Sequence, residues 1–150
     1  MKHNLDKLRG PKLSRIQLAI DVANLEEAID FYSKMFSSEP SKVKPGYANF
    51  SIEEPPLKLV LTENLDNAGS LNHLGVEVDE VEKVHEANAR MTGQGLATSG
   101  IDETMCCYAD KTETWIKGPD GVQWEWYVKK GDNEQFENVV ISSITTCCEN

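Results

Sequence analysis

The side chains best suited to chemistry in this sequence are those of His73, Gln17 and Glu125. His73 lies in residues 71–78, where apolar and polar residues alternate, and this pattern predicts a strand with the imidazole on its polar face. Residues 15–22 repeat the pattern 56 positions earlier and bring Gln17 to the equivalent place. Glu125 lies between two tryptophans in a third alternating stretch, where a carboxylate is costly unless it is paired or bound to a metal.

An imidazole nitrogen, an amide oxygen and a carboxylate are donors that suit a divalent cation such as Fe(II), Mn(II), Ni(II) or Zn(II). Three protein ligands would leave coordination positions open to water, substrate or dioxygen, as a catalytic metal needs. Two of the three residues also have a structural interpretation. His73 can be a hydrogen-bonded strand histidine, and Glu125 can be a salt-bridged strand glutamate, so the sequence leaves both interpretations open.

The four cysteines form two adjacent pairs, Cys106–Cys107 and Cys147–Cys148. Neither pair has the spacing of a structural zinc site, and adjacent cysteines are poorly placed to form a disulfide with each other. Two nearby thiolates chelate soft ions such as trivalent arsenic, Cd(II) or Hg(II), although the first pair can equally be two small buried side chains. Because neighbouring side chains of a regular strand point to opposite faces, chelation by Cys106 and Cys107 predicts a bend or bulge there. No specific role is expected for Cys147 and Cys148.

The elements that must hold these residues follow the same order twice along the chain. Asn24 is a plausible N-cap, and the apolar residues after it recur at helical spacing; a second helix is predicted to end at Gly93. A polar stretch at 99–105 is predicted to be a loop, and Gly118–Gly121 a hairpin turn. The remaining strands are expected at 47–52, 57–62, 113–117 and 123–129.

Each half therefore predicts a β-α-β-β-β module, and the fold class is α+β. Two tandem modules, at about 14–63 and 71–131, are expected to form one domain whose mixed sheet makes a cup with a polar interior. Residues 1–13 are expected to be a flexible N-terminal segment. Residues 132–150 are expected to be a C-terminal tail.

The overall charge and hydropathy of the chain exclude several classes of partner. The net charge is −10, which disfavours a basic surface for nucleic acid or anionic membrane. No apolar run is long enough to span a bilayer, and the N-terminus lacks the apolar core of a secretion signal. The expected location is the cytoplasm, where thiols stay reduced.

Six short stretches of the sequence resemble one group of proteins. They are residues 14–19 (SRIQLA), 31–36 (FYSKMF), 44–50 (KPGYANF), 55–61 (PPLKLVL), 72–78 (NHLGVEV) and 106–109 (CCYA). With the duplication, they resemble the vicinal oxygen chelate superfamily of glyoxalase I, bleomycin-resistance proteins and extradiol dioxygenases. Within it the chain is most similar to the organoarsenical carbon–arsenic lyases, to which cadmium-induced proteins are close. The resemblance covers about residues 14–131, and the adjacent cysteines are its most specific mark.

This resemblance implies a non-haem Fe(II)-dependent dioxygenase in which Gln17, His73 and Glu125 are the metal ligands and Cys106 and Cys107 bind the substrate. The implied reaction uses dioxygen as co-substrate to break the carbon–arsenic bond of a trivalent organoarsenical, such as methylarsenite or a reduced aromatic arsenical, and releases arsenite. Ni, Mn, Co or Zn are the alternatives to iron in the purified protein. The predicted loop at 99–105 could act as a lid that carries the thiols toward the metal.

Two other functions fit the same fold. A non-catalytic protein could bind arsenic or cadmium through its thiols without turnover. An enzyme that cleaves catechols would need a stronger histidine-containing ligand set and no thiols, so this sequence disfavours it. A monomer and a homodimer are both compatible with the sequence.

Overall fold

The structure is a computed structural model that describes residues 14–106, 108–132 and 139–140. Contacts divide the chain into two compact units, Arg15–Gly75 and Val76–Asn150, the latter grouped with Met1–Ser14. The boundary falls inside strand β5, Leu71–Val78. The expected N-terminal segment and most of the expected tail lie outside the described residues.

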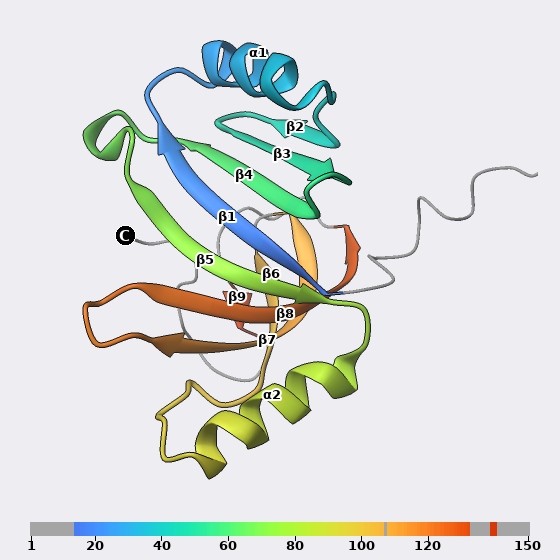
Figure 1. The fold of residues 1–150 in the computed structure, drawn as a ribbon, viewed down its shortest axis with the longest axis vertical. Helices are drawn as coiled ribbons and strands as arrows, with labels where there is room; N and C mark the ends of the chain where they lie inside the picture. The colour runs from blue at the N-terminus through green and yellow to red at the C-terminus, as the bar shows by residue number, and fades with distance from the viewer. Residues whose placement is uncertain (1–13, 107, 133–138, 141–150) are drawn as a thin grey trace, which may run out of the picture. The chain divides into compact units, whose positions relative to one another are not determined.

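The unit Arg15–Gly75, called the first unit below, holds the first β-α-β-β-β module (Figure 1). Its elements are β1 (Arg15–Val22), α1 (Leu25–Phe36), β2 (Lys42–Lys44), β3 (Tyr47–Ile52), β4 (Leu57–Glu63), a short 3-10 helix η2 (Leu65–Asn67) and the first part of β5. The strand order is β2-β3-β4-β1-β5. β1 is parallel to β4, while β2 and β3 pair with their neighbours in antiparallel fashion.

Helix α1 begins where the sequence predicts. The side chain of Asn24 accepts a hydrogen bond from the backbone N–H of Glu27 at 3.0 Å, which confirms the predicted N-cap. A second free N–H of the first turn, that of Leu25, donates to Glu63 Oε2 at 2.9 Å. The helix therefore starts with side-chain acceptors from its own cap and from the end of β4.

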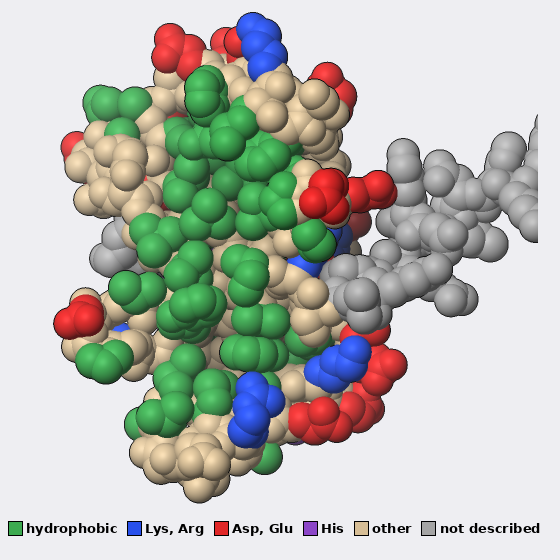
Figure 2. Space-filling model, viewed as in Figure 1, with side chains coloured by type: hydrophobic (Ala, Val, Ile, Leu, Met, Phe, Trp, Pro, Cys, Tyr) green, Lys and Arg blue, Asp and Glu red, His purple; other side chains and the backbone are tan. Residues whose placement is uncertain are grey.

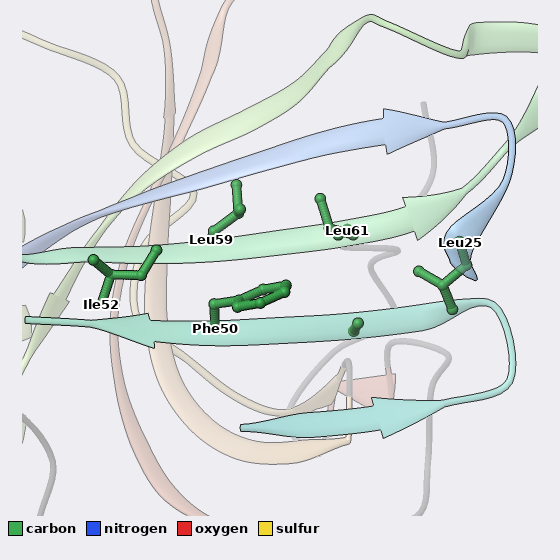
Figure 3. Packing of buried hydrophobic residues seen from close by; sticks show 6 residues of the cluster. Leu25, Phe50, Ile52, Leu59 and Leu61 are labelled. Carbon is green, nitrogen blue, oxygen red and sulfur yellow. The ribbon is translucent and has the colours of Figure 1, made fainter. Parts of the chain in front are cut away.

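The core of the first unit lies between α1 and one face of the sheet. Its buried members are Leu25, Ala48, Phe50, Ile52, Leu59 and Leu61. Figure 3 shows Phe50 on β3 beside Leu59 and Leu61 on β4, with Leu25 from the start of α1 among them. Because strand side chains alternate, the face away from α1 receives the intervening residues, and these include Gln17.

The unit Val76–Asn150, called the second unit below, repeats the order of the first. Its elements are the rest of β5, α2 (Val81–Gly93), β6 (Asp102–Cys106), β7 (Ala109–Lys117), β8 (Gln123–Asp132) and β9 (Val139–Val140). The strand order is β5-β8-β7-β6-β9, so the first strand of each module neighbours the fourth. The α+β fold of two β-α-β-β-β modules is thereby confirmed.

Helix α2 covers an apolar face formed by residues from β5 and β8. Val76, Val78, Val84 and Val128 form this core, and α2 ends at Gly93 as predicted. The other side of α2 is polar, and acidic and basic side chains gather around that helix in Figure 2. Neither of the α-helices among the described residues has the length and apolar character that crossing a bilayer requires.

The prediction of a loop at 99–105 is correct for residues 99–101 and wrong for residues 102–105. Residues from Asp102 to Cys106 form β6, which pairs with β7 on one side and with β9 on the other. The stretch carries few apolar side chains, so its sequence gives no strand period, and the strand is held by backbone hydrogen bonds along both edges. A strand paired on both edges is not free to move as the lid that the loop prediction suggested.

Candidate metal centre

The first unit brings together two of the three predicted metal ligands. β1 carries Gln17 and β5 carries His73, and Gln17 Nε2 lies 3.1 Å from His73 Nε2. The two side chains are only 4% and 8% exposed. A buried imidazole nitrogen therefore lies beside the amide of Gln17, the residue that the 56-residue repeat puts at the equivalent position.

The other ring nitrogen of His73 has a partner of its own. His73 Nδ1 lies 2.7 Å from Oδ1 of the preceding residue, Asn72, and Asn72 Nδ2 donates to Asp21 Oδ1 at 3.3 Å. In metal sites, a ligating histidine usually makes such a hydrogen bond through the nitrogen that does not bind the metal. Asn72 and Asp21 were not singled out by the sequence, because a lone polar residue beside His73 gives no signal by itself.

The face of the first unit that carries Gln17 is polar as well as buried. Lys58 lies opposite Gln17 in the register of β1 and β4, and it is buried although the sequence offered no candidate on that strand. Asn49 Nδ2 donates to the hydroxyl of Tyr47 at 3.0 Å on β3. Buried polar groups cost free energy unless they are satisfied, so the polar side chains of this face need hydrogen-bond partners within it.

The second unit holds the third predicted ligand, Glu125, near the start of β8. Its side chain is fully buried, and Oε1 accepts a hydrogen bond from Lys111 Nζ on β7 at 2.7 Å. The interpretation of Glu125 as a salt-bridged strand glutamate is therefore true of this structure. An ion pair and metal binding are compatible roles, because a carboxylate can accept at two oxygens.

A second carboxyl group lies beside Glu125. Glu113 on β7 accepts a hydrogen bond from Trp115 Nε1 at 3.0 Å. Burial, and next the negative charge of Glu125, raise the pKa of Glu113 to about 8, although Lys111 acts in the opposite direction. Near neutral pH Glu113 therefore holds a proton, and Lys111 Nζ lies 2.7 Å from the carboxylate of Glu125.

Tyr127 extends the same buried cluster. Its hydroxyl donates to Glu77 Oε2 at 2.8 Å, and Lys111 Nζ lies 4.7 Å from the centre of its ring. The sequence prediction missed Lys111 and Glu113 as site residues, and it began the strand at Glu113, which left Lys111 outside it. Residues 109–117 show no alternation of apolar and polar side chains, so the pattern there carries no signal for a buried face.

The backbone next to the cysteine pair departs from regular strand geometry, in agreement with the bend or bulge predicted there. β6 ends at Cys106, which pairs with Ala109 at the start of the antiparallel β7. Tyr108 has a φ of 62°, in the left-handed region that a regular strand does not visit. The side chain of Cys106, all of Cys107 and the second pair, Cys147 and Cys148, lie outside the described residues.

The chemistry of the three predicted donors, an amide oxygen, an imidazole nitrogen and a carboxylate, suits a divalent cation. Within the described ranges no group of three or more His, Cys, Asp and Glu residues lies close enough together to hold a metal. The predicted set has only two residues of those types, His73 and Glu125, with the amide of Gln17 as third donor. All three side chains are buried. His73 Nδ1 lies beside Asn72 Oδ1, as is common for metal-ligating histidines, and Nε2 lies 3.1 Å from Gln17 Nε2.

Comparisons with known proteins agree with the duplicated fold. The model of the Glyoxalase/Bleomycin resistance protein/Dioxygenase superfamily matches residues 14–126. The cadmium-induced protein CadI of Mycobacterium tuberculosis is 52% identical over 124 residues, which cover 83% of this chain and 82% of that protein. A trivalent organoarsenical cleaving enzyme of Thermomonospora curvata is 49% identical over 137 residues, which cover 91% of this chain and 89% of the enzyme.

A solved structure shows the same fold at low sequence identity. The Mn(II)-bound glyoxalase of Novosphingobium aromaticivorans has a TM-score of 0.56 and 17% identity, over 83% of this chain and 43% of the glyoxalase chain. The family match covers both modules, and the relatives cover most of the described residues. This chain belongs to the Glyoxalase/Bleomycin resistance protein/Dioxygenase superfamily.

Proposed function

We propose that this protein is a non-haem Fe(II)-dependent dioxygenase that cleaves the carbon–arsenic bond of trivalent organoarsenicals and releases arsenite. The observation that carries the proposal is the buried pair of Gln17 and His73, whose nitrogen atoms lie 3.1 Å apart on neighbouring strands. The relative that is named a trivalent organoarsenical cleaving enzyme, at 49% identity, supports the choice of substrate.

In this proposal the metal is held by Gln17 Oε1, His73 Nε2 and a carboxylate oxygen of Glu125. When bound, Fe(II) would supply the capacity to bind and activate dioxygen. An amide ligates a cation through its oxygen. The side-chain amide of Gln17, which places its nitrogen beside His73 in this structure, would therefore rotate to present its carbonyl oxygen to the metal. Ni, Mn, Co and Zn are the other ions that this donor set accepts.

The residues around Glu125 prepare that ligand. Lys111 donates to Oε1 and so fixes the direction of the carboxylate. Glu113 holds a proton near neutral pH, which keeps a second negative charge out of the cluster. All three side chains are buried, and the cluster excludes water from one side of the ligand.

The substrate would be held by Cys106 and Cys107, because trivalent arsenic exchanges its hydroxyl groups for thiolates. Fixing the arsenic places its carbon substituent at a defined site and removes most of the entropy cost of the encounter. For methylarsenite the atoms balance with one dioxygen: CH3As(OH)2 and O2 give As(OH)3 and formaldehyde. The carbon is oxidised and dioxygen is reduced, so no further reductant is needed.

The test is an aerobic turnover assay on protein loaded with Fe(II) under anaerobic conditions. Methylarsenite is added with and without dioxygen, and arsenite and formaldehyde are quantified. The proposal expects the two products in equal amounts and only with dioxygen. Glu125→Gln should abolish product, whereas Glu86→Gln, which changes an exposed glutamate of α2, should not.

The cysteine variants separate the role of each pair. Cys106→Ser with Cys107→Ser should bind Fe(II) as before and form no product, because the arsenic is no longer held. Cys147→Ser with Cys148→Ser serves as the matched control and should retain turnover. Arsenite formation at the same rate in both double variants would contradict the assigned role of the first pair.

The second candidate function is thiol-based binding of arsenic or cadmium without turnover. It is favoured by the relative named cadmium-induced protein, which is 52% identical to this chain. It predicts tight binding of methylarsenite or Cd(II) that requires Cys106 and Cys107, with no arsenite formed at any dioxygen concentration. The turnover assay therefore decides between the two functions.

A further inference from the structure

The imidazole of His73 is linked through a short chain of hydrogen bonds to a buried carboxylate. His73 Nδ1 lies 2.7 Å from Asn72 Oδ1, and Asn72 Nδ2 donates to Asp21 Oδ1 at 3.3 Å. Asp21 is 1% exposed, and its backbone is fixed by hydrogen bonds with Ser70 and Gly69. All of these residues belong to the first unit.

Asp21 determines which side of the Asn72 amide faces His73. A carboxylate only accepts hydrogen bonds, so Asn72 must turn its NH2 group to Asp21 and its carbonyl oxygen to the imidazole. A carbonyl oxygen also only accepts, so His73 Nδ1 must carry the proton. In a neutral imidazole the lone pair is then on Nε2, the nitrogen that faces Gln17.

Gln17 cannot impose this tautomer by itself. Its amide can offer either an N–H or a carbonyl oxygen to His73 Nε2, so it fits both neutral forms of the ring. Asn72 lacks that freedom because Asp21 accepts from its NH2 group. The direction of the whole chain of hydrogen bonds is therefore set at its buried carboxylate end.

We infer that Asn72 and Asp21 are positioning residues that hold His73 in the tautomer protonated at Nδ1, with the Nε2 lone pair presented as a ligand. The inference deepens the proposed function, since that function gives Nε2 a metal to bind. The tautomer itself is a property of the metal-free protein. Partners of this kind typically contribute 10- to 100-fold to metal affinity.

The first test reads the tautomer by nitrogen-15 NMR of the histidine rings in metal-free protein, at a pH where the rings are neutral. His73→Gln identifies the signals of His73 among the three histidines. In the wild type, Nδ1 should have the shift of a protonated nitrogen and Nε2 that of a nitrogen with a lone pair. Asn72→Leu removes the acceptor at similar size and should give a mixture of tautomers.

Two further variants keep the test valid if Asn72→Leu does not fold. Asp21→Asn is nearly isosteric but no longer dictates the direction of the Asn72 amide, so the bias toward one tautomer should weaken. The exchange Asp21→Asn with Asn72→Asp places an amide donor against a carboxylate acceptor and should restore the bias. Asn67→Ala, which changes an exposed residue of η2, should have no effect. Wild-type nitrogen shifts in both Asn72→Leu and Asp21→Asn would overturn the inference.

The second test measures Mn(II) affinity by competition with a chelator. Asn72→Leu should bind Mn(II) 10- to 100-fold more weakly than the wild type, and the exchanged pair should recover most of that loss. Wild-type protein that binds no Mn(II) would defeat the proposed function but leave the tautomer result standing. Wild-type tautomer and wild-type affinity in Asn72→Leu would defeat the inference while the proposed function stands.

Discussion

Replacing Lys111 by methionine tests whether Glu125 depends on its ammonium partner in the metal-free protein. Lys111 is 6% exposed and Glu125 is fully buried, and their charged atoms lie 2.7 Å apart. Removing one partner of a buried ion pair leaves the other charge without compensation, which typically costs about 3–5 kcal/mol. Methionine nearly matches lysine in length, so the change removes the charge with little loss of packing.

The matched control is a pair at the surface. Lys34 and Asp30 also lie 2.7 Å apart, but their side chains are 76% and 67% exposed. Lys34→Met should therefore change the free energy of unfolding by only about 0–1 kcal/mol. The comparison isolates burial, because the distance between the charged atoms is the same in the two pairs.

A double variant completes the experiment. When Lys111→Met is combined with Glu125→Met, both charges of this pair are removed, and most of the lost stability should return. The assay is urea unfolding in the presence of a chelator, analysed for the free energy and for its denaturant dependence. A Lys111→Met variant within 1 kcal/mol of the wild type, or a double variant no more stable than Lys111→Met, would refute the reasoning.

Three further changes follow from the same structure. Glu113 keeps its proton up to a pKa of about 8 in the folded protein, whereas the unfolded chain releases it near 4.5. The free energy of unfolding of the metal-free protein should therefore fall by roughly 4–5 kcal/mol as the pH rises between these values. Urea unfolding at several pH values should show this fall in the wild type and a flatter dependence in Glu113→Gln. Leu61→Ala empties a fully buried site in the first core and should cost about 2–5 kcal/mol in urea unfolding; a cost below 1 kcal/mol would mean that this core is not packed as described. Tyr127→Phe removes the hydroxyl that donates to Glu77 and should lower the free energy of unfolding by about 1–3 kcal/mol in the same assay. An unchanged free energy of unfolding would argue against the 2.8 Å hydrogen bond.

Local patterns predicted much of the fold because they act over a few residues. The N-cap of Asn24 and the apolar stripe of α1 lie within one helix, and the structure has both. The turn at Gly118–Gly121 is likewise present, with a hydrogen bond from Gly121 N to Gly118 O and a φ of 87° at Gly121. The equivalence of Gln17 and His73 came from the internal repeat, which carries information over a longer distance than any single element.

The parts that sequence reasoning missed depend on strand pairing. β6 is held on both edges by neighbouring strands, so its polar sequence carries no apolar period to recognise. Lys111 and Glu125 meet because β7 pairs with β8, and nothing near either residue indicates that register. The raised pKa of Glu113 depends in turn on its burial and on the nearby Glu125, so it could be found only after the register was known.

The proposal that Gln17, His73 and Glu125 share one ion is tested by an equilibrium titration of the metal-free protein with Mn(II). The account predicts one equivalent bound by the wild type and the loss of that same equivalent in Gln17→Ala, His73→Ala and Glu125→Ala. His85→Ala, which removes an exposed imidazole of α2, should bind as the wild type does. One equivalent bound with wild-type affinity by any of the three ligand variants would contradict the account.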